Sequence, residues 1–184
     1  MIKDAINIYK KRLIRFEDDN FFLDKKRALN ISRMIIKERL NIRWFVQGAT
    51  VKSIEEFSDK ELRLVEKSGC RIIKFGTESG SDKMLRLFNK NTNIKNIVKM
   101  NKRLKRFNIR PFYSFISGFP YETKKDIKKS VELMFRLKKD NPHSIISAVN
   151  IFTPFFGTKM YDIALDKGLK RPEKLEDWIK YEYK

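Results

Sequence analysis

Five segments of this sequence place carboxylates, amides, hydroxyls or glycines directly after a short apolar run. The segments are Glu17–Phe22, Gln47–Gly48, Gly76–Ser81, Ser117–Thr123 and Thr153–Thr158. Carboxylate and amide oxygens accept hydrogen bonds from an ammonium group, and hydroxyls and backbone amides can bind sugar hydroxyls. Gathered at one edge, such groups could hold a polar ligand that carries an amine and a ribose. Loops between strands and helices also use these residue types for turns and caps, so spacing alone leaves both interpretations open.

The counts of two residue types limit the metal chemistry of this chain. Its 184 residues include one cysteine, Cys70, and one histidine, His143. One cysteine excludes an internal disulfide and any complete zinc or iron–sulfur site built from cysteines of this chain alone. One histidine excludes a histidine-rich metal site. We expect Cys70 to be a small buried apolar residue, and His143 to be a surface residue.

The apolar runs before the polar segments are predicted to be strands, and the amphipathic stretches between them helices. Ser58 and Glu61 form a capping box where one helix should begin, and Gly69 suits the left-handed position that ends it. Trp44 lies inside a predicted strand and should pack in the core. Strands are predicted at 13–16, 42–47, 71–76, 112–116 and 145–152, and helices at 24–39, from 58, 82–107 (one helix, or two broken near 89–93), 124–139 and 159–167.

The alternation of strands and helices predicts an α/β fold. The strand–helix units start roughly 30–40 residues apart, which is typical of βαβ crossovers and therefore of a parallel sheet covered by helices. An open doubly wound sheet and an arc of a β/α barrel both fit this pattern. In either architecture ligands bind at the carboxyl ends of the strands, where the five polar segments would meet.

Four strings occur in a characteristic order: FEDDNFF at 16–22, FGTESGSDKML at 75–85, SFISGFPYET at 114–123 and TPFFGTKMYD at 153–162. Together they resemble the radical S-adenosylmethionine (SAM) superfamily, and most closely the branch whose members often carry an upstream cobalamin-binding domain. The resemblance extends from about residue 4 to residue 180. It implies a partial (βα)6 barrel, of which residues 1–184 would form a partial core domain with about five parallel strands and outer helices. Residues 172–184 would be a C-terminal extension packed on that domain.

The resemblance also implies cofactors. In the family, three cysteines spaced C-x-x-x-C-x-x-C hold a [4Fe–4S] cluster in the loop after the first strand. The cluster binds the amino and carboxylate groups of SAM, and its reduction yields a 5′-deoxyadenosyl radical. The protein positions and shields this chemistry. Members with the upstream domain also use cobalamin.

Four residues near the first two predicted strands match the family's SAM-binding positions. Asp18, Asp19 and Asn20 stand where the family's second-strand motif binds the methionine amino group. Gln47, after the next strand, would face the same edge and could reach SAM or the substrate. Carboxylate and amide oxygens suit an ammonium group.

Six further positions match the family at later strand ends. Glu78 and Ser79 stand where contacts to the ribose or the methionine part of SAM are usual. Ser117–Gly118 match the stretch beside the adenine, and Thr153–Pro154 the strand end whose backbone meets the adenine. The ten named residues are therefore the expected cofactor-binding set, with no metal ligand and no assigned catalytic residue among them.

The sequence departs from the family pattern in three places. Tyr121 stands where the family often has glycine, and Phe155–Phe156 where a proline commonly precedes the Gly-Thr pair. The sequence also starts within the family's first helix, so the first strand and the three-cysteine loop are absent from it. We therefore expect a missing N-terminal segment or a separate polypeptide to supply the cluster ligands, and the chain alone to be inactive. The strand at 13–16 would be an exposed edge through which the chain could self-associate.

The net charge of +19 indicates possible polyanion binding. Ten basic residues and no acidic residue lie between positions 83 and 110, and Lys95, Lys99, Lys102 and Arg106 share one helical face. A solvated outer helix explains this face as well as an RNA-binding surface does. The alternative function is thus a non-catalytic binding or scaffold protein that holds RNA or a protein partner through this helix. Whether the substrate is a small molecule or RNA stays open.

The sequence carries no signal for export. Its start has no apolar signal-peptide core, and no stretch approaches the ~20 apolar residues that span a membrane. With a single cysteine, this favours a cytoplasmic location.

Overall fold

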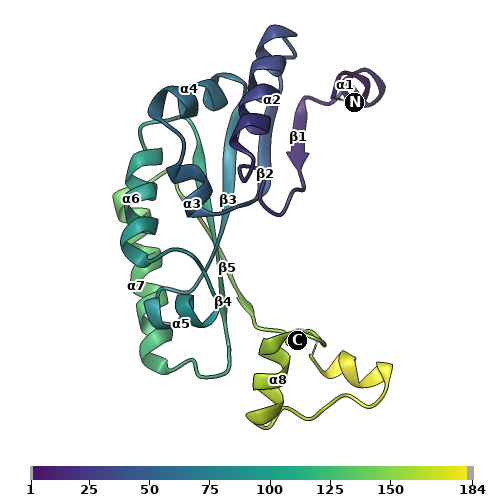
Figure 1. Cartoon of the computed structure of the whole chain (residues 1–184), viewed down its shortest axis with the longest axis vertical. Helices are drawn as coiled ribbons and strands as arrows, with labels where there is room; N and C mark the ends of the chain where they lie inside the picture. Colours follow the sequence, from purple (N-terminus) through teal and green to yellow (C-terminus); the bar gives the residue numbers. More distant parts are fainter. Residues whose placement is uncertain (1, 182–184) are drawn as a thin grey trace.

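The computed structural model describes residues 2–181 and contains one sheet of five parallel strands (Figure 1). The strands follow one another across the sheet in chain order, and each pairs with its sequence neighbour. This order, with a helix between successive strands, is that of a barrel arc and not of a doubly wound sheet, whose strand order reverses. The strands are β1 (Leu13–Phe16), β2 (Arg43–Ala49), β3 (Cys70–Glu78), β4 (Arg110–Ser117) and β5 (Ile145–Ile151).

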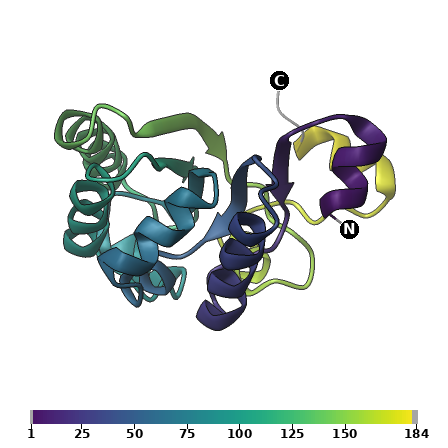
Figure 2. The ribbon, with the colours of Figure 1, turned by 90° about the horizontal axis from the view of Figure 1, so that it is seen from above.

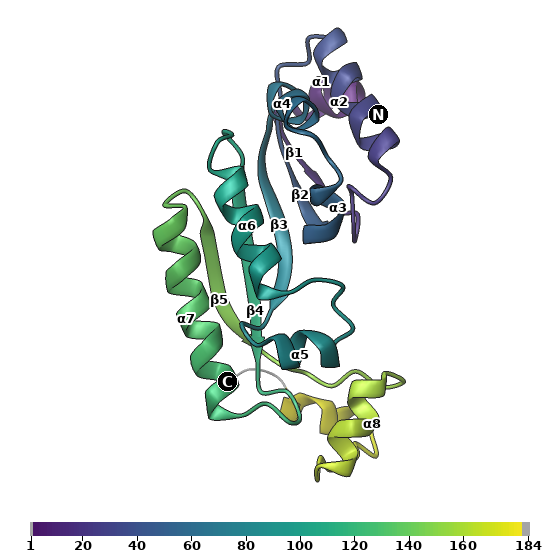
Figure 3. The same cartoon turned by 60° about the vertical axis from the view of Figure 1, so that its left-hand side comes forward.

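Helices connect the strands and cover one face of the sheet (Figure 2). In Figure 3, α6 and α7 lie side by side along the sheet. The helices are α1 (Ile2–Tyr9), α2 (Lys25–Lys37), α3 (Val51–Glu55), α4 (Asp59–Lys67), α5 (Asp82–Leu87), α6 (Ile94–Leu104), α7 (Lys124–Asp140) and α8 (Lys159–Asp166), and a 3-10 helix, η1, spans Leu175–Tyr181.

The core lies between the sheet and these helices. Side chains alternate along β3, so Ile73, Phe75 and Thr77 are buried toward the helices, while Lys74 and Gly76 face the other side. Trp44 of β2 is fully buried and donates its indole N–H to the backbone oxygen of Ser68, as the prediction of a core role requires. The second face of the sheet is therefore available to line a site.

The predicted elements are all present. Of the two alternatives for 82–107, the broken one is correct: α5 and α6 are separate helices, and Asn93 caps α6. β3 continues through Gly76 to Glu78. The five-residue helix α3 was not predicted, because it is too short to show a helical period.

The C-terminal part carries α8 and η1. The rings of Tyr161 and Trp178 lie 6.2 Å apart, between α8 and η1. Residues 182–184 of the predicted extension lie outside the described residues. Among residues 2–181, no helix is long and apolar enough to cross a membrane.

Candidate functional site

The loop after β1 is held against the end of β2. Phe21 and Phe22 are fully buried in the core, and the backbone N–H of Phe21 donates to the Gly48 oxygen at 3.1 Å. A Cβ atom on Gly48 would lie 2.2 Å from the backbone oxygen of Asp19. Because only glycine allows this approach, Gly48 fixes the position of the Asp19 loop.

The three polar residues of this loop point to different partners. Asp18 forms a 2.8 Å ion pair with Arg27 of α2. Asn20 accepts a hydrogen bond from the Ser53 hydroxyl at 3.1 Å and so joins the capping network of α3. Asp19 has no hydrogen-bond or ion-pair partner within the described part of the chain, and it lines a cavity between β2 and β3. Asp19 is therefore the carboxylate of this loop that is available to a ligand.

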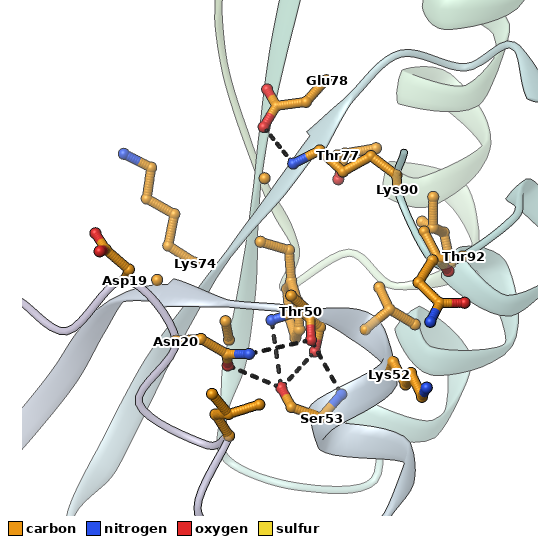
Figure 4. Close-up of a pocket in the computed structure, with 18 of the residues that line it drawn as sticks. Asp19, Asn20, Thr50, Lys52, Ser53, Lys74, Thr77, Glu78, Lys90 and Thr92 are labelled. Atoms are coloured by element: carbon orange, nitrogen blue, oxygen red, sulfur yellow. Dashed lines mark hydrogen bonds and ion pairs between the residues drawn. The ribbon is translucent and has the colours of Figure 1, made fainter. Parts of the chain in front are cut away.

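The end of β3 brings a second carboxylate to the cavity. Glu78 takes a left-handed conformation with φ of +61°, and its Oε1 lies 3.0 Å from the Lys90 ammonium. A Cβ atom on Gly76 would lie 2.5 Å from that Oε1 and 3.3 Å from the Lys90 nitrogen. The bare Gly76 backbone thus makes room for the ion pair. Figure 4 shows the Glu78–Lys90 pair among the residues that line the cavity.

The cavity has a volume of about 570 Å³, large enough for a drug-sized ligand. Its polar lining contains carboxylates, ammonium groups, side-chain amides and hydroxyls. The hydroxyl oxygens of Thr77 and Thr92 are buried and have no hydrogen-bond partner within the described residues. The polar lining includes Asp19, Asn20, Gln47, Thr50, Ser53, Lys74, Thr77, Glu78, Lys90, Thr92 and Ser114.

Ser79 supports the site without lining this cavity. It is fully buried, its hydroxyl lies 3.3 Å from that of Ser130 on α7, and it accepts from the backbone of Ser81. A Cβ atom on Gly80 would lie 2.4 Å from the Lys129 backbone oxygen. The segment after Glu78 is therefore packed tightly against α7.

A buried carboxylate ties the same segment to the start of α7. Asp126 accepts hydrogen bonds from the Ser81 hydroxyl at 2.6 Å and the Thr123 hydroxyl at 2.6 Å. Lys83 adds an ion pair at 3.2 Å. The hydrogen bonds from Ser81 and Thr123 outweigh the effect of burial and hold the pKa of Asp126 well below its usual range.

The predicted adenine-side residues form a second group at the ends of β4 and β5. Glu122 accepts from the Ser117 hydroxyl at 2.8 Å and from the Gly118 backbone N–H at 2.6 Å. The Phe152 N–H donates to the Ser117 oxygen at 2.8 Å, which places Thr153–Pro154 beside this turn. These four residues lie at the same edge of the sheet as the cavity but do not line it.

The structure thus brings four of the ten predicted residues into one cavity: Asp19, Asn20, Gln47 and Glu78. Sequence reasoning missed Lys90 and Lys74. Lys90 lies in the connection between α5 and α6, which the sequence showed only as a helix break. Lys74 lies inside a strand whose alternation with buried Ile73 and Phe75 could have placed it on the ligand side.

The residues that could have held a metal lie elsewhere. Cys70 starts β3, at the end of the strand opposite the cavity, and is fully buried as predicted. Burial raises the pKa of its thiol far above the ordinary value. His143 is exposed in the loop before β5, also as predicted. Within residues 2–181, no group of three or more Cys, His, Asp or Glu side chains could hold a metal ion.

The basic face of α6 is partly neutralised by its neighbours. Arg106 pairs with Asp59 of α4 at 2.8 Å, and Lys102 with Asp140 of α7 at 3.5 Å. Lys95 and Lys99 are exposed and have no ion-pair partner within the described residues. The arrangement fits a solvated outer helix, and the RNA-binding alternative stays a prediction.

A family model, curated proteins and solved structures all match this chain. The family model of the radical SAM superfamily matches residues 1–134. An uncharacterized methyltransferase, PH0819 of Pyrococcus horikoshii, is 30% identical over 161 residues, which are 88% of this chain and 33% of the relative. The radical SAM methyltransferase TsrM of Kitasatospora setae, solved with cobalamin and a [4Fe–4S] cluster, superposes with a TM-score of 0.67 at 14% identity, over 83% of this chain and 30% of TsrM. This chain therefore spans about a third of the length of either protein.

Proposed function

Because this chain belongs to the radical SAM superfamily, we propose that the cavity between β2 and β3 binds SAM and forms the strand-end part of a radical SAM active site. The observation that carries the proposal is the charge arrangement of the cavity. An unpaired carboxylate, Asp19, and a carboxylate–ammonium pair, Glu78 with Lys90, line one space of about 570 Å³. The methionine part of SAM carries an ammonium and a carboxylate, which are complementary to such a site.

Four polar side chains of the cavity have roles in this proposal. Asp19 accepts hydrogen bonds from the SAM ammonium, and Lys90 pairs with the SAM carboxylate. Glu78 binds the ribose hydroxyls, and Gln47 orients the ligand. SAM, when bound, supplies a methyl group or a 5′-deoxyadenosyl group. The contribution of this chain is to hold and orient it and to exclude water.

The residues of this chain do not fit a [4Fe–4S] cluster, because the family holds it with three cysteines and this sequence has only Cys70. We propose that another polypeptide segment supplies those ligands. The edge of β1 supports this, since within residues 2–181 β1 pairs with β2 alone, and Leu13 at that edge is 64% exposed. Cobalamin is bound in the TsrM structure. We assign it no ligand here, because His143 lies at the end of the sheet opposite the cavity.

The methyltransferase relatives favour methyl transfer as the reaction of the complete enzyme. The first test, however, needs only this chain. Isothermal titration with SAM should show binding that Lys90→Met and Asp19→Asn each weaken at least tenfold, because each removes a charge-assisted hydrogen bond. Lys60→Met removes an exposed lysine of α4 and is the matched control, expected to bind SAM like the wild type. Absence of SAM binding by the folded wild-type chain would overturn the proposal.

A further inference from the structure

We propose that Lys74 binds an anionic group of the substrate, so that the substrate class is an apolar or aromatic molecule with one carboxylate or phosphate. This inference rests on the proposed function, because it places the substrate beside the SAM cavity. Lys74 lies in the middle of β3 and lines the cavity. Figure 4 shows its side chain extending away from the Glu78–Lys90 pair.

The strand register puts Lys74 on the face of the sheet that the connecting helices leave free. Its neighbours Ile73 and Phe75 are buried toward the helices, so Lys74 points to the opposite side. Lys74 is paired in register with Phe112 of β4, and Gly76 with Ser114. Lys74 therefore lies two residues before Gly76 on β3, and Gly76 lies against the Glu78–Lys90 pair.

The Lys74 ammonium has no carboxylate or hydrogen-bond partner within the described residues. It lies over the ring of Phe112, whose centroid is 5.6 Å from the nitrogen. Lys90, in contrast, is paired with Glu78 at 3.0 Å. Lys74 is half-buried as a residue, and its ammonium can donate three hydrogen bonds, so an anion in the cavity is a suitable acceptor. The Lys74 ammonium is thus available to a ligand that carries a negative charge.

The surroundings of Lys74 define the rest of the ligand. On the same face, Phe45 of β2 is paired in register with Ile72 of β3, and Phe112 adjoins Lys74. All three side chains are half-buried and apolar. Ser114 adds one hydroxyl to the cavity lining. A planar or apolar body with a single anionic group is complementary to this combination of apolar surface and one ammonium.

Matched ligand pairs on the full chain test the proposal. Indole-3-acetate and phenyl phosphate are the anionic probes, and indole-3-acetamide and benzyl alcohol are their neutral counterparts. Ligand-observed NMR titration should show at least tenfold tighter binding of the anions to the wild type. Lys74→Met should abolish that preference and Lys74→Arg should retain it, because Arg keeps the charge. Lys60→Met should behave like the wild type, and the better of the two anions identifies carboxylate or phosphate as the preferred group.

The outcomes separate this inference from the SAM proposal. An anion preference that survives in Lys74→Met, or that Lys60→Met weakens equally, would overturn the inference and leave SAM binding untouched. If Lys74→Met weakens SAM as strongly as Lys90→Met does, Lys74 belongs to the SAM site and the substrate assignment is wrong. If SAM does not bind the wild type while the anion preference depends on Lys74, the proposed function fails and the anion site stands.

Discussion

At the scale of single residues, two glycines shape the cavity in different ways. A side chain on Gly76 would meet the mobile ends of Glu78 and Lys90, whereas a side chain on Gly48 would meet the backbone of Asp19. Gly76→Ala should therefore fold with a melting temperature close to that of the wild type but bind SAM at least tenfold more weakly, because the ion pair is displaced. Gly48→Ala should lose both affinity and about 1–3 kcal/mol of stability. Differential scanning fluorimetry and SAM titration measure both effects, and equal melting temperatures for the two variants would contradict this account.

A second residue-scale prediction concerns pH. The Lys25 ammonium and the hydrogen bonds from Ser58 lower the pKa of Glu61 to about 2, against an ordinary value of about 4.3. A lowered folded-state pKa stabilises the protein above the unfolded-state pKa, and this contribution disappears as pH falls through the folded-state value. Glu61→Gln should thus be less stable than the wild type at pH 7. In urea titrations the difference should stay constant down to about pH 5 and shrink toward pH 2; a difference independent of pH would contradict the assignment.

Tyr121 shows how a departure from the family pattern appears in the backbone. The family often has glycine there, and Tyr121 has φ of +67°, a conformation that glycine adopts without strain. Lys83 donates to the Tyr121 backbone oxygen at 2.9 Å and Lys167 lies 4.5 Å from the centre of its ring. These two lysine contacts therefore stabilise Tyr121 in a backbone conformation with an unfavourable positive φ.

At the scale of elements, the sequence was informative where apolar periodicity was long. The strands and the helices α2, α6 and α7 could be predicted from that periodicity. Each of them buries one face in the core, and this burial produces the periodic apolar pattern. The short helix α3 and the joint between α5 and α6 carry too few residues for a period. Those short segments supply Ser53 and Lys90 to the cavity, whereas Lys74 was missed although its strand was predicted.

Hydrogen bonds and an ion pair between the start of α5 and α7 position the end of β3. Asp126 receives the Ser81 and Thr123 hydroxyls and the Lys83 ammonium. Asp126→Ala should cost about 2–3 kcal/mol, because charged hydrogen bonds are lost and buried donors are left unpaired. Glu132→Ala, on an exposed position of the same helix, should change stability by less than ~0.5 kcal/mol. Urea denaturation compares the two, and a similar effect of both variants would contradict a specific role for Asp126.

At the scale of the whole molecule, the fold class and the common edge of the polar segments followed from the βα rhythm. The sequence did not show which of the ten predicted residues would line the cavity and which would not. Parallel strands bring all carboxyl ends to one edge, but hydrogen bonding of the loops decides which side chains face the cavity. Asp18 pairs with Arg27 of α2, and the Ser79 hydroxyl contacts that of Ser130 on α7. Glu122 accepts hydrogen bonds from Ser117 and Gly118. Such pairings depend on tertiary contacts that no local pattern contains.

The open sheet edges make a prediction about association. β1 exposes an unpaired edge with Leu13 at 64% exposure, and β5 exposes Val149 at 44% at the other edge. Unpaired edges favour strand pairing between copies, while a net charge of +19 opposes it. Sedimentation velocity should therefore show association that increases from low salt to 0.5 M NaCl, since salt screens the repulsion.

Substitutions at the two edges identify the one that pairs. Leu13→Lys places a charge on the β1 edge and should suppress the association seen at high salt, because a lysine there opposes edge-to-edge pairing. Val149→Lys adds the same charge at the β5 edge and should leave association largely intact if β1 is the pairing edge. A wild-type chain that stays monomeric at high protein concentration and high salt would show that the β1 edge does not pair with itself. Suppression by Val149→Lys alone would instead assign the association to β5.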